Sequence, residues 1–171
     1  MSCAAALVKT CISSVGSVKK AWVAETSDIT SMTKTGTKYA TITMGASAVF
    51  YNIAITNGQF LRKKAPGRQR GAYTNTITLN VNQVTQDVRD FLEAVGSCCS
   101  LTLIIEDNDK QKWVVGFIGL TSAAMGEDDG AFLLDADLDT GADKPTGQMS
   151  KIVFECISNE IPREYTGTVP V

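Results

Sequence analysis

The feature that most constrains this chain is a period-two alternation of apolar and polar residues. Between residues 73 and 81, the apolar side chains Ile77, Leu79 and Val81 alternate with threonines and an asparagine. Such an alternation is typical of a β-strand that buries one face and exposes the other. The chain is therefore expected to be rich in β-structure.

Other short segments have the same character. With 73–81 they give about eight expected strands, at residues 17–24, 39–44, 49–56, 59–63, 101–106, 113–117 and 151–157. The pair Asn57-Gly58 suits a type I′ turn and predicts a hairpin between 49–56 and 59–63. Segments 59–63 and 73–81 are expected to form a ribbon with its tip at Pro66-Gly67, and Asp107–Lys110 a further hairpin. The polar stretch 26–38 is expected to be a loop.

One segment has helical periodicity instead. Its apolar residues share one helix face, and they are Val84, Val88, Phe91, Leu92 and Val95. Asn82 or Thr85 can cap the start of this helix, and Gly96 can end it. The expected fold class is mainly β (α+β): a β-sandwich or barrel of about eight strands with one flanking amphipathic helix.

Length and composition point to a single core. The chain has 171 residues, of which 44% are hydrophobic, and no shift in composition suggests a second domain. We expect one β-rich domain at residues 1–158 and an extended C-terminal tail at 159–171, which contains Pro162 and Pro170. The first residues lack the charged start of a signal peptide, and no apolar run reaches the length of a membrane span. The expectation is a soluble protein made in a cytoplasm, with no membrane partner.

The sequence offers little for catalysis. It has no histidine, which removes the general base of a Ser-His-Asp or Cys-His site and most zinc sites. Phosphate-binding glycine motifs and nucleophile elbows are absent as well. Chemistry by a pair of carboxylates stays open, because any two of the 18 acidic residues can meet in a fold. We expect a protein that is not an enzyme and needs no cofactor or metal.

The five cysteines suit reduced thiols better than a disulfide framework. They are an odd number and include an adjacent pair: Cys3, Cys11, Cys98, Cys99 and Cys156. Cys156 is expected to be a small hydrophobic residue in a strand.

One acidic motif resembles the start of an EF-hand calcium loop. It runs from Asp135 to Gly141, with acids at every second position. An EF-hand needs glycine at its sixth position and glutamate at its twelfth, and these positions hold Thr140 and Thr146. A solvated acidic loop within the weakly structured segment 125–147 is the preferred interpretation, with a calcium site as the alternative.

The charges are divided between two segments. Five basic residues gather near one hairpin tip: Arg62, Lys63, Lys64, Arg68 and Arg70. Seven acidic residues gather in the other segment: Glu127, Asp128, Asp129, Asp135, Asp137, Asp139 and Asp143. Opposite patches on one molecule can pair head-to-tail between copies and so close into rings or stack into tubes. These residues are the candidate subunit interface, with two solvated loops as the alternative.

Nucleic-acid binding is a second hypothesis. The five basic residues of the hairpin could contact phosphates, with an affinity that falls steeply with salt. The net charge is only −2 and the pI about 5.1, so there is no general basic field. Only Phe60 and Tyr73 flank the basic residues as aromatic groups for stacking on bases.

The order of segments also resembles a family. The segment 15–24, the alternating strand before the helix and the segment 103–116 together resemble small β-rich tail proteins of bacteriophages such as the crAss-like phages. The resemblance covers about residues 16–157 in order and type, and the acidic insertion 126–143 departs from it. It implies a tail-tube-like fold in which a long hairpin, here 59–81, reaches the next ring.

The resemblance further implies a structural virion protein of the tail. Its copies would assemble in the host cytoplasm as a tube, such as a hexamer, or as a connector ring of twelve, beside other tail or connector proteins. DNA would pass through without specific binding, along an acidic or neutral lumen that repels its backbone. Three classes stay open: a tail or ring subunit, a nucleic-acid-binding module and an enzyme with unrecognised carboxylate chemistry.

Overall fold

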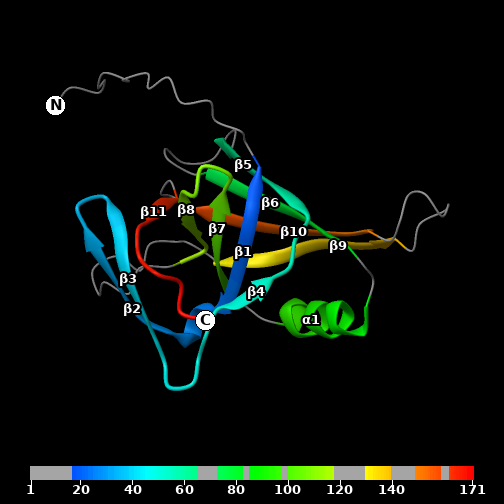
Figure 1. The fold of residues 1–171 in the computed structure, drawn as a ribbon, viewed down its shortest axis with the longest axis horizontal. Helices are drawn as coiled ribbons and strands as arrows, with labels where there is room; N and C mark the ends of the chain where they lie inside the picture. The colour runs from blue at the N-terminus through cyan, green and yellow to red at the C-terminus, as the bar shows by residue number, and fades with distance from the viewer. Residues whose placement is uncertain are drawn as a thin grey trace.

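The fold is a single strongly curled sheet with one helix. The computed structural model describes residues 17–64, 73–82, 85–97, 100–117, 130–139, 149–158 and 162–171. Within them it has eleven strands, a 3-10 turn and an α-helix (Figure 1). The strands are β1 (Val18–Glu25), β2 (Ile29–Thr35), β3 (Lys38–Met44), β4 (Tyr51–Ile53), β5 (Asn57–Lys64), β6 (Tyr73–Asn82), β7 (Leu101–Asp107), β8 (Lys112–Val115), β9 (Ala131–Asp139), β10 (Met149–Ser158) and β11 (Arg163–Tyr165). The helices are η1 (Thr26–Asp28) and α1 (Gln86–Ser97).

The strands follow one path from edge to edge. Their order is β2-β3-β11-β8-β7-β9-β10-β6-β5, and β1 pairs with β7 and β4 off this path. All pairs are antiparallel except β11 with β3, so the sheet is mixed. The sheet curls until β5 returns beside β1, where the Ser17 hydroxyl donates to the carbonyl oxygen of Gly58 at 3.3 Å. The expected fold class, a mainly β protein with one flanking helix, is confirmed.

Two hydrophobic cores lie on the two faces of β1 and β7. The first fills the inside of the curl with alternate residues of β6, β7 and β10, among them Ile77, Leu103 and Phe154. The second lies between the other face of β1 and β7 and the β2–β3 hairpin, around Trp22 and Phe50. Six consecutive residues of β7 are buried because both faces of that strand are covered. Cys156 is buried in the first core, as predicted.

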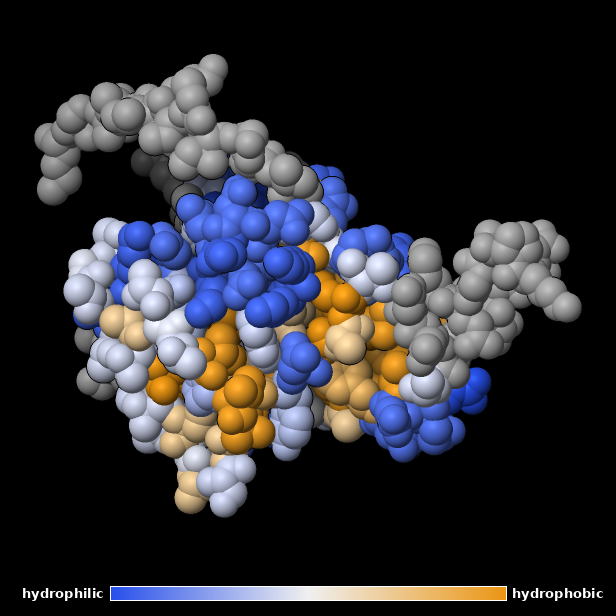
Figure 2. All heavy atoms as spheres, in the orientation of Figure 1, coloured by the Kyte–Doolittle hydropathy of each residue, from blue (hydrophilic) through white to orange (hydrophobic). Residues whose placement is uncertain are grey.

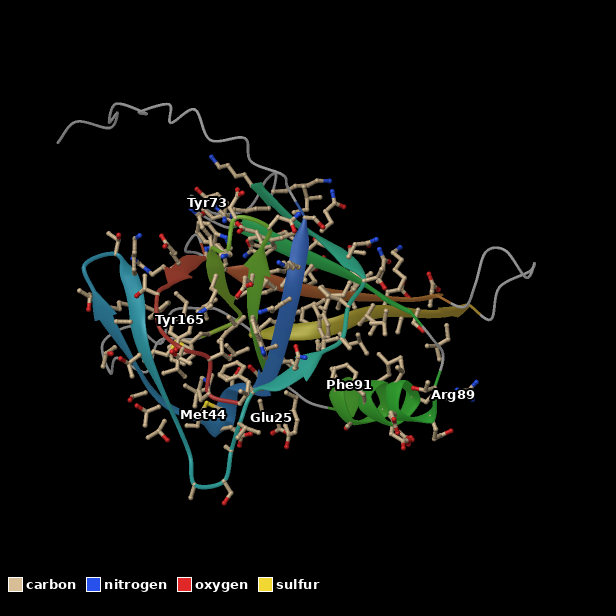
Figure 3. All side chains as sticks on the ribbon, in the orientation of Figure 1. Glu25, Met44, Tyr73, Arg89, Phe91 and Tyr165 are labelled. Atoms are coloured by element: carbon tan, nitrogen blue, oxygen red, sulfur yellow. The ribbon has the colours of Figure 1, made fainter. Side chains whose placement is uncertain are left out.

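The helix α1 covers the open end of the first core, below β9 and β10 in Figure 1. Val88, Phe91, Leu92 and Val95 face the core, and Figure 3 shows Phe91 pointing toward the sheet while Arg89 points away. The Thr85 hydroxyl accepts a hydrogen bond from the backbone amide of Val88 at 3.4 Å, so Thr85 is the cap. The helix was predicted, and Thr85 was one of the two predicted caps. Gly96 was expected to end the helix but lies inside it, because α1 continues to Ser97.

The predicted hairpin at Asn57-Gly58 is wrong. Both residues are the first of β5, and β4 pairs with β1 instead. A Cβ atom at position 58 would lie 2.9 Å from the carbonyl oxygen of Thr78 and 3.1 Å from the Cβ of Val18. The glycine is needed for the close approach of β5 to β1, which outweighs the local turn preference.

Two neighbouring expectations are also wrong. Segment 26–38 contains η1 and β2 rather than one loop, because β2 pairs with β3 along most of its length. The strand expected at 49–56 is reduced to β4, and Tyr51 is 63% exposed although Ile53 is buried. The long ribbon of β5 and β6 and the hairpin of β7 and β8 are confirmed. The ribbon tip at Pro66-Gly67 lies outside the described residues.

The C-terminal segment 162–171 is extended, but it belongs to the fold. β11 inserts between β3 and β8, and Tyr165 and Val169 are buried in the second core. The backbone amide of Phe50 donates to the carbonyl oxygen of Pro170 at 2.8 Å. A segment predicted from its prolines to be a tail therefore completes the sheet.

Burial of Tyr165 gives a first testable consequence. Its hydroxyl donates to the carbonyl oxygen of Thr168 at 2.6 Å, and desolvation raises its pKa above the ordinary value of 10.0. The unfolded chain therefore loses this proton at lower pH than the folded one, so the free energy of unfolding falls as pH rises above about 10. Urea unfolding across alkaline pH should show a shallower loss for Tyr165→Phe. Tyr51→Phe, at an exposed position, should leave the slope unchanged.

Candidate assembly surface

The strand β5 forms a free edge of the sheet. It pairs with β6 along its whole length, and from Gln59 onward its other side has no strand partner within the described residues. The carbonyl oxygen of Gly58 points away from β6, toward Ser17. Because backbone directions alternate along a strand, Phe60, Arg62 and Lys64 present their amide and carbonyl groups to this free edge. The edge can accept another strand.

The strand β9 forms a second free edge. It pairs with β10 from Ala131 to Asp139, and with β7 only at Ala131 among the described residues. The direction of the backbone groups can be followed from Gly58 through the paired residues of β5, β6, β10 and β9. It places the backbone groups of Asp135 and Asp137 toward β10, and those of Ala136 and Leu138 toward the unpaired side of β9. The strands β9, β10, β6 and β5 are thus a four-stranded antiparallel sheet in which neither outer edge has a strand partner beyond Gly58 on β5 and Ala131 on β9, while α1 packs beside β9 near Leu133.

The two edges carry opposite charges. Three of the predicted basic residues, Arg62, Lys63 and Lys64, end β5, and Asp135 and Asp137 are exposed on β9. Asp139 ends β9. The remaining members of the predicted interface lie outside the described residues: Arg68, Arg70, Glu127, Asp128, Asp129 and Asp143. The described basic and acidic residues belong to different edges and form no ion pair with each other.

The acidic segment is not a loop where it is described. Residues 131–139 form β9, so the prediction of a solvated loop and the alternative of a calcium loop are both wrong there. An extended strand sends alternate side chains to the same face, too widely spaced to surround one ion. The described residues contain no group of three or more side chains that could hold a metal ion.

Exposed leucines accompany the acids on β9. Leu134 is 51% exposed and Leu138 40% exposed. A bulge at Val153/Phe154 of the β9–β10 ladder leaves Leu134 without a register partner. Beyond it, Ala136 and Leu138 face the core side of the sheet, opposite Ile152 and Ser150, while Asp135 and Asp137 face the outer side.

A groove of about 730 Å³ lies beside the free edge of β5. Its apolar wall consists of Val18, Phe60, Ile105 and Trp113, from β1, β5, β7 and β8. The indole of Trp113 donates to the Asp107 carboxylate at 3.4 Å, which orients the ring. Polar residues complete the lining, among them Gln59, Asn80 and Asp107. The groove suits an apolar side chain brought by an added strand.

Arg62, two residues along β5 from Phe60, has no carboxylate partner among the described residues. Its guanidinium lies 5.6 Å from the centre of the Phe60 ring. Desolvation lowers the pKa of its guanidinium below the ordinary value, and the charge of the Tyr73 phenolate opposes this shift. Its Nε makes no hydrogen bond within the described part of the chain. Neither does the side-chain amide of Asn75, which is fully buried and lies opposite Arg62 on β6. The core side of the β5 edge therefore carries hydrogen-bonding groups that have no partner among the described residues.

A second, smaller hollow lies between α1 and the sheet. It holds about 220 Å³ and is mainly apolar, with Ile53, Val81, Val88 and Phe91 in its wall. Figure 2 shows hydrophobic residues between β4 and α1, whereas hydrophilic residues gather where β5, β7 and β8 end. Among the described residues that line these two hollows there is no acid–base pair of the kind that catalysis requires.

No pattern within a single segment indicates the groove. Phe60, Ile105 and Trp113 come from three strands, and only the curl of the sheet brings them together. The β9 edge does have a sequence signal, because the alternation of Asp135, Asp137 and Asp139 with Ala136 and Leu138 is a period-two pattern. The same alternation also matches the start of a calcium loop, so it does not by itself distinguish a strand from a loop.

Comparisons with known proteins leave these surfaces to be interpreted on their own. No protein-family model, no curated protein and no solved structure matches this chain. None of the described helices is long and apolar enough to cross a membrane.

Proposed function

We propose that this protein is a structural subunit that assembles with copies of itself into a ring or tube, as a phage tail tube or connector protein does. The observation that carries the proposal is the four-stranded sheet β9-β10-β6-β5, whose two free edges are oppositely charged. The edges belong to different strands, so pairing them is a head-to-tail contact, and such contacts close into rings.

The sheet has the geometry for continuation between copies. Its strands are antiparallel in sequence, so β5 of one copy and β9 of the next also meet antiparallel. Joining them satisfies the free backbone groups of both edges. Residues with free backbone groups point their side chains to the core side on both strands, so the core and outer faces stay continuous across the junction.

The outer face of this sheet suits passage of DNA. On β6 it carries Thr74, Thr76, Thr78 and Asn80, which are uncharged. On the other three strands it carries three acids and two lysines, so its described charges are weakly acidic in sum: Asp135, Asp137, Glu155, Lys63 and Lys151. A neutral to acidic surface does not hold the phosphate backbone. In a closed ring this face would line the lumen, and DNA would slide along it without specific binding.

Nucleic-acid binding by the basic end of β5 remains a second candidate function. Lys63 and Lys64 are exposed and Arg62 is half-buried on Phe60. These groups could contact phosphates, and the predicted mark is an affinity that falls with salt. Charge alone favours this function, whereas charge and the free backbone groups of two edges favour assembly.

Charge reversal on β5 tests the assembly. Light scattering over a concentration series, with electron micrographs of the same samples, should show rings or tubes of uniform width for the natural protein. Lys63→Glu/Lys64→Glu should raise the concentration needed for assembly by roughly tenfold or more, because like charges then face each other. Lys19→Glu/Lys34→Glu, which reverses two exposed lysines of β1 and β2, is the matched control and should assemble normally.

A compensating exchange distinguishes the two functions. Asp135→Lys/Asp137→Lys should restore assembly to the β5 variant if the edges meet. Rescue of assembly would not be expected for a nucleic-acid binder, whose affinity for a labelled oligonucleotide depends on its basic residues and not on contact between the two edges. A protein that stays monomeric at all concentrations and binds the oligonucleotide would overturn the proposal.

A further inference from the structure

We infer that the groove beside β5 is the receptor for Leu138 of a neighbouring copy, in one specific register of the two edges. This inference rests on the proposed self-assembly and names the side chains that form the contact between copies. The groove is a site on one edge, and the exposed leucine is on the other.

Backbone directions restrict the register. Residues with free backbone groups must meet residues with free backbone groups, so Phe60 and Arg62 must lie opposite Ala136 or Leu138. A shift by one residue would place backbone groups against already bonded ones and would turn every side chain to the wrong face. Only shifts in steps of two residues along each strand remain.

Shape selects among the remaining registers. When Phe60 lies opposite Leu138, the leucine reaches the apolar wall formed by Phe60, Ile105 and Trp113. The same register places Arg62 opposite Ala136, whose short side chain leaves the guanidinium its stacking position on Phe60. A slip in one direction places Leu138 at Gly58, where β1 already approaches. A slip in the other direction places Leu138 against the guanidinium of Arg62.

Charge agrees with this register on the outer face. Lys63 then lies opposite Asp135, and Asp137 lies diagonally across from it. Both carboxylates and the ammonium are exposed and form no ion pair within the described residues. The backbone groups of Lys63 bond to β6, and those of Asp135 bond to β10. In the new ladder the two residues therefore form a non-hydrogen-bonded pair, whose Cα atoms approach to about 4.5 Å.

Disulfide trapping tests the register, because such a close pair suits a disulfide. The Lys63→Cys/Asp135→Cys protein, oxidised mildly after assembly, should give a ladder of covalent oligomers on a non-reducing gel. The matched variant Lys63→Cys/Asp137→Cys should give little. The two single-cysteine variants measure background from the native thiols.

The outcomes separate this inference from the assembly it rests on. A ladder from the Asp137 variant instead would overturn the register and leave edge pairing intact. Assembled rings with no ladder from either variant would overturn the edge contact. Absence of rings in the natural protein would overturn the assembly itself.

Substitution of the leucine tests the groove. Leu138→Ala should raise the concentration needed for assembly roughly tenfold or more, as expected for an anchor that fills a pocket. Leu134→Ala, at the more exposed leucine of the bulge, should change this concentration much less. Circular dichroism of both monomers should be unchanged, because neither residue is buried in one copy. Equal effects of the two substitutions would exclude the groove as receptor.

Discussion

Deletion of residues 162–171 is expected to abolish the second hydrophobic core. The segment contributes Tyr165 and Val169 to that core and β11 to the sheet between β3 and β8. Replacing one large buried aromatic residue by alanine already costs about 3–5 kcal/mol. Loss of the whole segment is comparable with the roughly 5–15 kcal/mol by which a domain is stable. The β2–β3 hairpin then has no strand partner on its inner side.

The two tryptophans allow this loss to be located. Trp22 is buried in the second core, and Trp113 packs against the first. In the Trp113→Phe background, the fluorescence of Trp22 should shift to the red on deletion, which reports exposure to water. In the Trp22→Phe background, Trp113 shows whether the first core persists. A chain that lacks only Val171, which is 75% exposed, should behave as the full chain does.

The result also decides how the segment should be regarded. An unchanged Trp22 spectrum and an unchanged urea midpoint in the shortened chain would show that 162–171 is an appendage, as its prolines and low apolar content suggested. The contacts argue otherwise, since the backbone amide of Phe50 and the side chain of Lys112 bond to the carbonyl oxygens of Pro170 and Gly167.

Local patterns predicted the elements that bury one face within a single segment. The alternation of Ile77, Leu79 and Val81 identified β6, and the spacing of Val88, Phe91 and Val95 identified α1, because both periods are properties of one strand or helix. The β7–β8 hairpin also followed from adjacent residues. Here the local signals and the tertiary fold agree.

The remaining features depend on contacts between distant segments. Asn57-Gly58 has the chemistry of a turn, but Gly58 is required where β1 lies against β5. β2 is polar and little buried, and its pairing with β3 gives no alternation that could reveal it. The candidate site was predicted in part: its charged residues were identified, but not that they occupy two free edges. That property follows from strand order, which no single segment determines.

Gly116→Ala is expected to be among the most destabilising substitutions at the described glycines. Gly116 follows β8 with φ +85°, a conformation that side chains rarely adopt. A Cβ atom there would lie 2.4 Å from the carbonyl oxygen of Leu101 and 2.7 Å from the backbone nitrogen of Ala131. Leu101 and Ala131 are the one register pair that joins β7 to β9. The added methyl group would push β7 and β9 apart. These two strands join the β8–β7 part of the sheet to the β9-β10-β6-β5 part.

The expected cost is about 2–5 kcal/mol, from positive-φ strain and overpacking against backbone atoms. Gly36→Ala is the matched control, because φ is +64° there and nothing lies within 4 Å of its added Cβ. It should cost only the strain, about 1–2 kcal/mol. Urea unfolding measures both values. Equal losses would mean that Gly116 is needed only for its backbone angle, whereas a larger loss at 116 with weaker assembly of the variant would show that the β7–β9 junction holds the four-stranded sheet in its curl.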